Sequence, residues 1–286
     1  MELYLINKNN QVLDLLKNRD KFILKSAEAL HGVDTTISEN ESPYMDGTNL
    51  EYVKVLPRSI ELTFKLIGNI KASIDYFTSV VKSKQYVTLR EVENGRDISI
   101  TGIATIPPYS RMERSCEITL TIYCGQPYWV DTNYTVGVID DIISLLAFPV
   151  DGQHFTINGR ALGEITNNMT KNLENDGDTS VGAVFVFEAT DPVVNPQLNC
   201  SSGEQQGWYM RLETTLNAGD QVVISTVKGD KYITINGVTT SEILNALKYN
   251  GTDWLQLEQG SNIFSISATS GEKNIYFNAM FKRKYE

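Results

Sequence analysis

Short runs in which apolar and polar residues alternate are the feature of this sequence that most restricts its fold. In Arg58–Leu66, the side chains of Ile60, Leu62, Phe64 and Leu66 share one face, with polar residues between them. This period of two is that of a β-strand with one buried face. Similar runs recur along the chain, bounded by Gly, Asn and Asp turn residues. The sequence therefore predicts a mainly β protein of antiparallel strands.

The first half of the chain combines such strands with one helix. Apolar residues at helical spacing follow Asn69, a favourable N-cap residue; they are Ile70, Ile74, Phe77 and Val81. The spacing predicts an α-helix over about residues 70–84, with Lys82 and Lys84 in its last turn. Asn94-Gly95 predicts a tight hairpin. Further strands are expected at residues 2–6, 21–24, 86–90, 96–105 and 116–124.

The second half repeats short strands with few helical windows. Turns are expected at Asn217–Asp220 and Asn236-Gly237, and Trp254–Leu257 is expected to be a strand. Thr239–Glu242 fits a capping box that opens a short helix through Leu247. This pattern predicts a second antiparallel β-sandwich. The change of pattern after Trp129 predicts two β-sandwich-type domains, residues 1–132 and 133–286.

One segment of the first half breaks the pattern. Residues 31–57 are polar, rich in Ser, Thr, Asn, Asp and Glu, and poorly periodic. Loops longer than about 12–15 residues inside a compact domain are usually functional or disordered. Two interpretations remain open from the residues alone: a solvated loop, or an arm that becomes ordered on a neighbouring subunit.

The net charge of −10 is concentrated in the second half. Residues 1–130 contain 15 basic and 16 acidic side chains, a balance of −1; the remainder contains 10 and 19, a balance of −9. Specific nucleic-acid binding needs clustered Lys and Arg, so none is expected. Such a surface would let DNA slide past without holding it.

The three cysteines and the amino terminus indicate where the protein folds. Cys116 and Cys124 lie on one face of one expected strand, roughly 26 Å apart at about 3.3 Å per residue. A disulfide needs Cα atoms within about 7 Å, so these two cannot pair. No signal-peptide pattern follows Met1, and no apolar run approaches the roughly 20 residues of a membrane span. We expect folding in a reducing cytoplasm, without membrane insertion.

Catalytic and metal-binding patterns are missing from the sequence. The two histidines, His31 and His154, have no evident partners, and no His/Cys cluster suits a metal. The acidic run 174–179 does not fit an EF-hand, so it is interpreted as a turn. The carboxylates that could serve a glycosidase are scattered and alternate with apolar residues: Glu61, Glu113, Glu117, Glu188 and Asp191. No enzyme activity and no cofactor are expected.

Exposed aromatic rings could instead stack on sugars. Trp208 and Tyr209 follow a Gly- and Gln-rich loop and are the better candidates for sugar contact. Trp254 precedes two leucines and is more consistent with core packing. A carbohydrate-binding module for a host cell-wall glycan is therefore the alternative function.

Taken in order, these motifs resemble the distal tail proteins (Dit) of siphophages. The first half is similar to the ring-forming N-terminal domain of that family, and the second half to its galectin-like C-terminal domain. The first-half motifs are Tyr44-Met45-Asp46-Gly47, Pro57–Leu62, the helix, the Asn-Gly hairpin and Ile118–Tyr128. The second-half motifs are 174–178, 191–198, 216–220, 231–237 and 254–262.

The resemblance implies a structural tail-tip or baseplate hub in the virion. It implies a ring, hexameric in the family, at the distal end of the tail tube, with a central DNA channel. The implied partners are the tail tube protein, the tape-measure protein, a tail-associated adhesin or lysin, and receptor-binding proteins. The candidate oligomer-interface residues in the polar segment are Tyr44, Asp46, Gly47, Asn49 and Tyr52. A glycan hydrolase would require two carboxylates that face each other in one groove.

Overall fold

The computed structural model describes residues 1–41, 46–109, 116–138, 140–144, 163–167 and 170–286. The chain forms two units: unit 1 comprises Met1–Asn133 and Lys284–Glu286, and unit 2 comprises Tyr134–Arg283. Each unit has its own buried apolar core. The prediction of a mainly β, antiparallel protein is confirmed. The last three residues return to unit 1, which no pattern in the sequence indicated.

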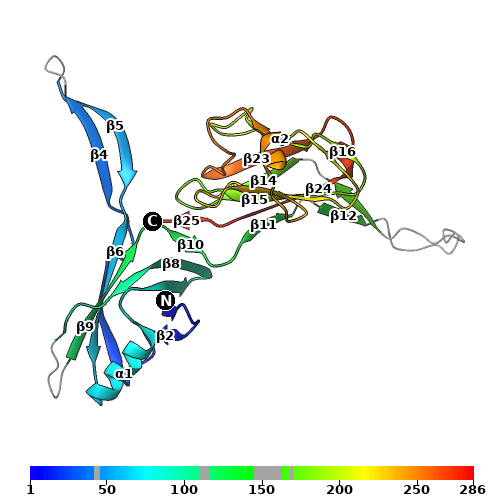
Figure 1. Cartoon of the computed structure of the whole chain (residues 1–286). Helices are drawn as coiled ribbons and strands as arrows, with labels where there is room; N and C mark the ends of the chain where they lie inside the picture. The colour runs from blue at the N-terminus through cyan, green and yellow to red at the C-terminus, as the bar shows by residue number, and fades with distance from the viewer. Residues whose placement is uncertain (42–45, 110–115, 139, 145–162, 168–169) are drawn as a thin grey trace, which may run out of the picture. The chain divides into compact units, whose positions relative to one another are not determined.

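Unit 1 is built on one nine-stranded antiparallel sheet (Figure 1). The main order is β2-β1-β7-β8-β9-β6-β3, and β10 pairs with β8 and β25. Every second residue of Arg58–Leu66 is buried, as the alternation predicted. The strands are β1 (Glu2–Asn7), β2 (Val12–Asp14), β3 (Phe22–Glu28), β6 (Arg58–Leu66), β7 (Gln85–Glu93), β8 (Arg96–Thr105), β9 (Cys116–Cys124), β10 (Trp129–Asp131) and β25 (Lys284–Tyr285).

The helix of unit 1, α1 (Ile70–Val80), covers part of the core. Its Phe77 ring packs edge-on against Phe22 and at a tilt against Phe64, with centroids 6.0 and 5.1 Å away. Asn69 caps the first turn, as expected, by accepting from the Ala72 N–H. The predicted end at residue 84 was wrong. Val81 is already extended and fully buried. Its packing in the core ends the helix before Lys82 and Lys84.

The polar segment is a hairpin rather than an irregular loop. β4 (Thr35–Glu41) and β5 (Thr48–Val55) pair only with each other and form a separate two-stranded sheet (Figure 1). Its described residues are exposed except Ser38 and Val55, which are half-buried. Alternation of apolar and polar residues indicates a strand with one buried face. Among the described residues, none buries a face of this hairpin, so its sequence shows no period of two.

Unit 2 is made of two five-stranded antiparallel sheets that share a core. Phe185 in the first sheet lies against Phe264 in the second, with ring centroids 5.4 Å apart. The first sheet, in spatial order, is β11 (Thr135–Val138), β24 (Ile275–Phe281), β15 (Ala183–Ala189), β20 (Gln221–Ser225) and β21 (Tyr232–Ile235). The second is β14 (Thr170–Asn175), β23 (Gly260–Ser267), β17 (Gln197–Cys200), β18 (Tyr209–Leu212) and β22 (Leu247–Tyr249).

Smaller elements complete unit 2. They are the strand pairs β12 (Asp140–Ser144) with β13 (Gly163–Asn167) and β16 (Val193–Val194) with β19 (Thr215–Leu216), the helix α2 (Ser241–Ala246) and the 3₁₀ turn η1 (Glu272–Asn274). The cap of α2 lies one residue later than the capping-box prediction, because Thr240 accepts from the Ile243 N–H.

Two further sequence predictions differ from the structure of unit 2. The short helix α2 ends before Leu247, which is extended and begins β22. Trp254 lies in a loop rather than a strand, and the segment pairs only through an isolated bridge between Leu257 and Val181. Among the described residues, no helix is long and apolar enough to cross a membrane.

Candidate functional site

The hairpin β4–β5 presents an exposed apolar face. Ile37 pairs directly with Val53, and Leu50 pairs with Glu39 on the same face after a bulge. Residues paired across an antiparallel ladder share one face. The exposed fractions of Ile37, Val53 and Leu50 are 50%, 60% and 64%. Three large apolar side chains therefore stand together in solvent, which is typical of a surface that another molecule covers.

The predicted interface residues lie elsewhere on the same hairpin. Asp46 and Gly47 are exposed at its tip, and Gly47 has a φ of +85°, a conformation that favours glycine. Asn49 and Tyr52 pair with Asn40 and Ser38, on the face opposite the apolar one. Tyr44 lies outside the described residues.

The base of the hairpin is fixed to unit 1 by buried polar groups. The carbonyl of Leu30, just before the hairpin, accepts from Trp129 Nε1 at 2.8 Å and from Arg58 Nη1 at 2.9 Å. Trp129 is fully buried, and burial lowers the pKa of Arg58. His31 stacks on Trp129 and places Nε2 3.3 Å from Glu91 Oε2. No partner of His31 was evident from the sequence, because Trp129 and Glu91 are distant from it along the chain.

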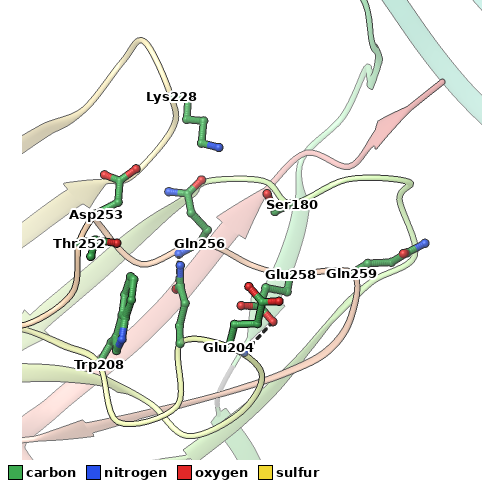
Figure 2. A pocket seen from close by; sticks show the side chains of 10 residues that line it. Ser180, Glu204, Trp208, Lys228, Thr252, Asp253, Gln256, Glu258 and Gln259 are labelled. Carbon is green, nitrogen blue, oxygen red and sulfur yellow. Dashed lines mark hydrogen bonds between the residues drawn. The ribbon is translucent and has the colours of Figure 1, made fainter. Parts of the chain in front are cut away.

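A pocket of about 460 Å³ lies among the loops of unit 2 (Figure 2). This volume is within the roughly 300–1,000 Å³ of small-molecule sites. Trp208, the candidate for sugar contact, lines the pocket, whereas Tyr209 does not. The other lining residues are Ser180, Glu204, Gln205, Lys228, Thr252, Asp253, Gln256, Glu258 and Gln259.

Hydrogen bonds between loops hold the shape of this pocket. Glu258 Oε2 accepts from the Glu204 N–H at 3.0 Å, and Gln205 Oε1 accepts from the Gln256 N–H at 2.9 Å. Asp253 accepts from Lys231, which lowers the pKa of its carboxyl, so this group is ionised at neutral pH. The pocket wall is therefore polar and partly anionic.

The acidic run 174–179 ends strand β14 at Asn175 and then bends, and Asn175 gives it a structural role. Asn175 is fully buried and donates Nδ2 to three backbone carbonyls: Thr179 at 3.0 Å, Glu258 at 3.2 Å and Leu257 at 3.3 Å. This side chain joins the turn to the loop that carries the pocket residues. In the part of the chain that the structure describes, no cluster of His, Cys, Asp or Glu suits a metal ion.

Two of the scattered carboxylates, Glu61 and Glu117, pair with Thr121 and Lys65, so they lie four positions apart along β6 and β9. Glu117 is half exposed and accepts from Lys25 Nζ at 2.7 Å, a bond that lowers its pKa. Glu113 and His154 lie outside the described residues.

Comparison with known proteins agrees with this architecture. Residues 176–285 match the model of the siphovirus-type tail component, C-terminal domain. The whole chain is similar to the crystal structure of the Dit protein (gp 19.1) of phage SPP1, with a TM-score of 0.68 and 11% identity over 99% of both chains. Residues 176–285 therefore correspond to a siphovirus-type tail-component domain, and the whole chain shares the fold of the SPP1 Dit protein.

Two further comparisons set the limits of this likeness. A chain of the phage P2 baseplate in its activated conformation matches with a TM-score of 0.50 and 12% identity, over 99% of this chain and 98% of that one. No curated protein matches significantly. At such low identity, the solved structures establish the fold that this chain shares with them, and inferences about its partners and ligands rest on its own residues.

The sequence indicated only part of these candidate surfaces. Trp208 was found because an aromatic residue after a polar loop is conspicuous. Gln256 and Glu258 were missed because they lie about 50 residues further along the chain, beside leucines that suggested a strand. The apolar face of the hairpin could have been found, since Leu50 and Val53 are large apolar residues in a polar segment.

Proposed function

We propose that this protein is a non-enzymatic hub of the siphophage distal tail (Dit) family that assembles into a ring, hexameric as in that family, at the distal end of the tail tube. The ring would surround a DNA channel and connect the tube and the tape-measure protein to an adhesin or lysin and to receptor-binding proteins. The proposal is supported by the family match, and by the absence of specific DNA-binding charge in a sequence of net charge −10.

One observation carries the assembly part of this proposal. The hairpin β4–β5 has a face of Ile37, Leu50 and Val53 that none of the described residues covers. Burial of apolar surface is favourable by about 25 cal/mol per Å² removed from water, so a partner that covers this face would be stabilised by it. A closed ring needs one surface of each copy to meet a different surface of the next. We assign the hairpin the role of one of these two surfaces.

Substituting Ile37, Leu50 and Val53 together by Ser tests this role. The exposed positions tolerate Ser within the monomer, so the triple variant should remain folded and lose the ring. Light scattering after size exclusion and negative-stain microscopy would measure assembly, and circular dichroism would confirm folding. Val238→Ser is the matched control, because Val238 is 57% exposed in unit 2. Rings of unchanged size in the triple variant would contradict the role of the hairpin.

A separate outcome tests the hub itself. Wild-type protein that stays monomeric at every concentration, alone and mixed with tail tube protein, would count against a ring-forming hub. The division into two units supports a further part of the proposal, in which unit 1 forms the ring and unit 2 holds adhesion proteins. Unit 2 produced alone should then be monomeric.

A further inference from the structure

Two hairpin turns of this protein share one dipeptide and one backbone conformation. Asn94-Gly95 joins β7 to β8 in unit 1, and Asn236-Gly237 follows β21 in unit 2. The φ angles are 50° and 82° in the first turn and 51° and 76° in the second. In both turns, the two residues that flank the dipeptide pair directly with each other. The turns therefore differ mainly in the contacts of their asparagine side chains.

An exposed Asn-Gly dipeptide reacts with itself and then with water. The backbone nitrogen of the glycine attacks the side-chain amide carbon of the asparagine, and the new C–N bond closes a succinimide ring. The amide nitrogen leaves as ammonia, together with the proton of the glycine N–H. Water then opens the ring at either carbonyl, which gives aspartate or isoaspartate. Glycine suits the attack because it has no Cβ to hinder the approach, and water is the only co-reactant.

The first of these dipeptides has both reacting groups available in the folded protein. Asn94 and Gly95 are exposed at the end of the ladder between β7 and β8. Within the described part of the chain, the Asn94 side chain makes no hydrogen bond or ion pair. The Gly95 N–H lies in the turn, beyond the last ladder pair of Glu93 with Arg96. The amide of Asn94 is therefore free to turn toward the Gly95 nitrogen.

The Asn236 side chain, in contrast, is held at both of its polar atoms. Its Oδ1 accepts from the Gln221 N–H at 2.9 Å, and its Nδ2 donates to Asp220 Oδ1 at 2.8 Å. The bond from Asn236 lowers the pKa of Asp220, so this carboxylate is ionised at neutral pH and the bond is charge-assisted. Rotation of the amide toward the Gly237 nitrogen would break both bonds.

The dipeptide Asn250-Gly251 is restrained in a similar way. Asn250 Oδ1 accepts from the Tyr209 N–H at 2.6 Å, and Nδ2 donates to the Gly207 carbonyl at 2.9 Å. The ring of Trp208 packs against Gly251. Among the Asn-Gly dipeptides that the structure describes, Asn94-Gly95 is therefore the one with an unrestrained side chain.

We propose that Asn94 is a modification site that converts spontaneously to aspartate and isoaspartate in the folded protein. Asn236 and Asn250 react more slowly, because two hydrogen bonds must break before either amide can turn. Two such bonds correspond to about tenfold or more in rate. The reaction needs only water, so this proposal does not depend on ring assembly.

The modified turn carries two contacts that the new charge would change. Glu93 Oε1 lies 3.4 Å from the amino group of Met1, and the Arg96 guanidinium lies over the Tyr285 ring, 4.4 Å from its centroid. A carboxylate at position 94 adds negative charge between Glu93 and Arg96, so it should draw Arg96 away from the Tyr285 ring. The isoaspartate form also lengthens the backbone of the turn, which should loosen the pairing of β7 with β8.

Peptide mapping by mass spectrometry on the full-length protein tests the proposal. The folded protein is kept at body temperature in mildly alkaline buffer, sampled over several weeks and digested under acidic conditions that stop the reaction. The fraction of aspartate plus isoaspartate at each Asn-Gly dipeptide gives its rate. Asn94 should convert about tenfold or more faster than Asn236. The same incubation in urea is the control, because unfolding removes the hydrogen bonds and should bring the two rates together.

Asp220→Ala tests whether hydrogen bonds protect the second turn. It removes the acceptor of Asn236 Nδ2, so Asn236 should convert several-fold faster while Asn94 keeps its rate. Asp230→Ala is the matched control, because Asp230 is an exposed acid of unit 2 whose side chain does not contact Asn236. Circular dichroism would confirm that both variants are folded.

Three results would overturn the proposal. The first is an Asn236 that reacts as fast as Asn94 in the folded wild-type protein. The second is an Asn94 that stays intact in the folded protein but reacts in urea. The third is an Asn236 rate that Asp220→Ala leaves unchanged, since the difference between the turns would then have another cause.

Discussion

The indole of Trp129 donates a hydrogen bond to the carbonyl of Leu30 at 2.8 Å, although the two residues are 99 positions apart. The guanidinium of Arg58 donates to the same oxygen at 2.9 Å. Leu30 precedes the first strand of the hairpin, β4. Arg58 follows the second strand, β5, and begins β6. One carbonyl therefore ties both ends of the hairpin to the core of unit 1.

Replacing Trp129 by Phe should destabilise unit 1. The substitution removes the hydrogen bond and leaves space in a fully buried site, so we expect a loss of about 1–3 kcal/mol in the free energy of unfolding. Urea unfolding followed by circular dichroism would measure it. Tyr123→Phe, at a position 52% exposed, is the control and should change little. An unchanged stability would show that Arg58 alone suffices at the hairpin base.

Substitution by Ala should lower the stability at Gly102 and leave it nearly unchanged at Gly125. A Cβ at Gly102 would lie 2.6 Å from the Tyr123 carbonyl oxygen and 2.8 Å from Cys124 Sγ, because β8 and β9 approach closely there. Overpacking of this kind costs about 1–3 kcal/mol. A Cβ at Gly125 meets nothing within 4 Å, so Gly125→Ala should stay within about 0.5 kcal/mol of wild type. Equal thermal stability of the two variants would refute the close approach.

Asn175→Asp should disrupt the loops that carry the pocket. The change keeps the shape but replaces an amide donor by a carboxylate that faces three carbonyl oxygens. We expect a loss of roughly 3 kcal/mol or more at neutral pH. Burial disfavours the ionised form, so the loss should shrink as the pH falls and the new carboxyl takes up a proton.

Asn172→Asp provides the control for that substitution. Asn172 is exposed, and its Oδ1 accepts from Ser261 Oγ at 2.6 Å, a bond that a carboxylate preserves. Denaturant unfolding at several pH values would compare the two variants. A pH-independent loss for Asn175→Asp would contradict the assigned donor role.

Asp97 should contribute to the acid sensitivity of unit 1. Arg90 donates to both of its carboxylate oxygens, at 2.8 and 2.6 Å, and Thr132 Oγ1 adds a third bond at 2.8 Å. These bonds hold the pKa of Asp97 below its ordinary value of 3.8. A lowered carboxyl pKa gives stability that is present above the unfolded pKa and is lost as pH falls through the folded one.

The stabilisation from Asp97 should therefore disappear below about pH 4. The pair is partly exposed, so its contribution is expected to be about 1 kcal/mol or less after screening by solvent and salt. Asp97→Asn should be less stable than wild type at pH 7, and the two should converge near pH 2. Unfolding curves across this range would measure the difference, and parallel curves would argue against the lowered pKa.

The sequence by itself determined the elements whose cause is local. Alternation placed β6 and β9 at the residues where the structure has them, because one face of each is buried. The Asn94-Gly95 turn was equally local: both residues adopt positive φ, 50° and 82°, which few other pairs tolerate. The Asn69 cap needed only the backbone of the next turn.

Tertiary structure alone decided what depends on distant partners. The end of α1 is set by burial of Val81 in the core, which overrides the favourable lysines beyond it. The pairing of Trp129 with Tyr285 brings the end of the chain back to unit 1. The pocket joins Trp208 with Gln256 across two loops. The periodicity of a sequence indicates which face of an element is buried, but not which residues bury it. These contacts therefore follow only from the folded chain.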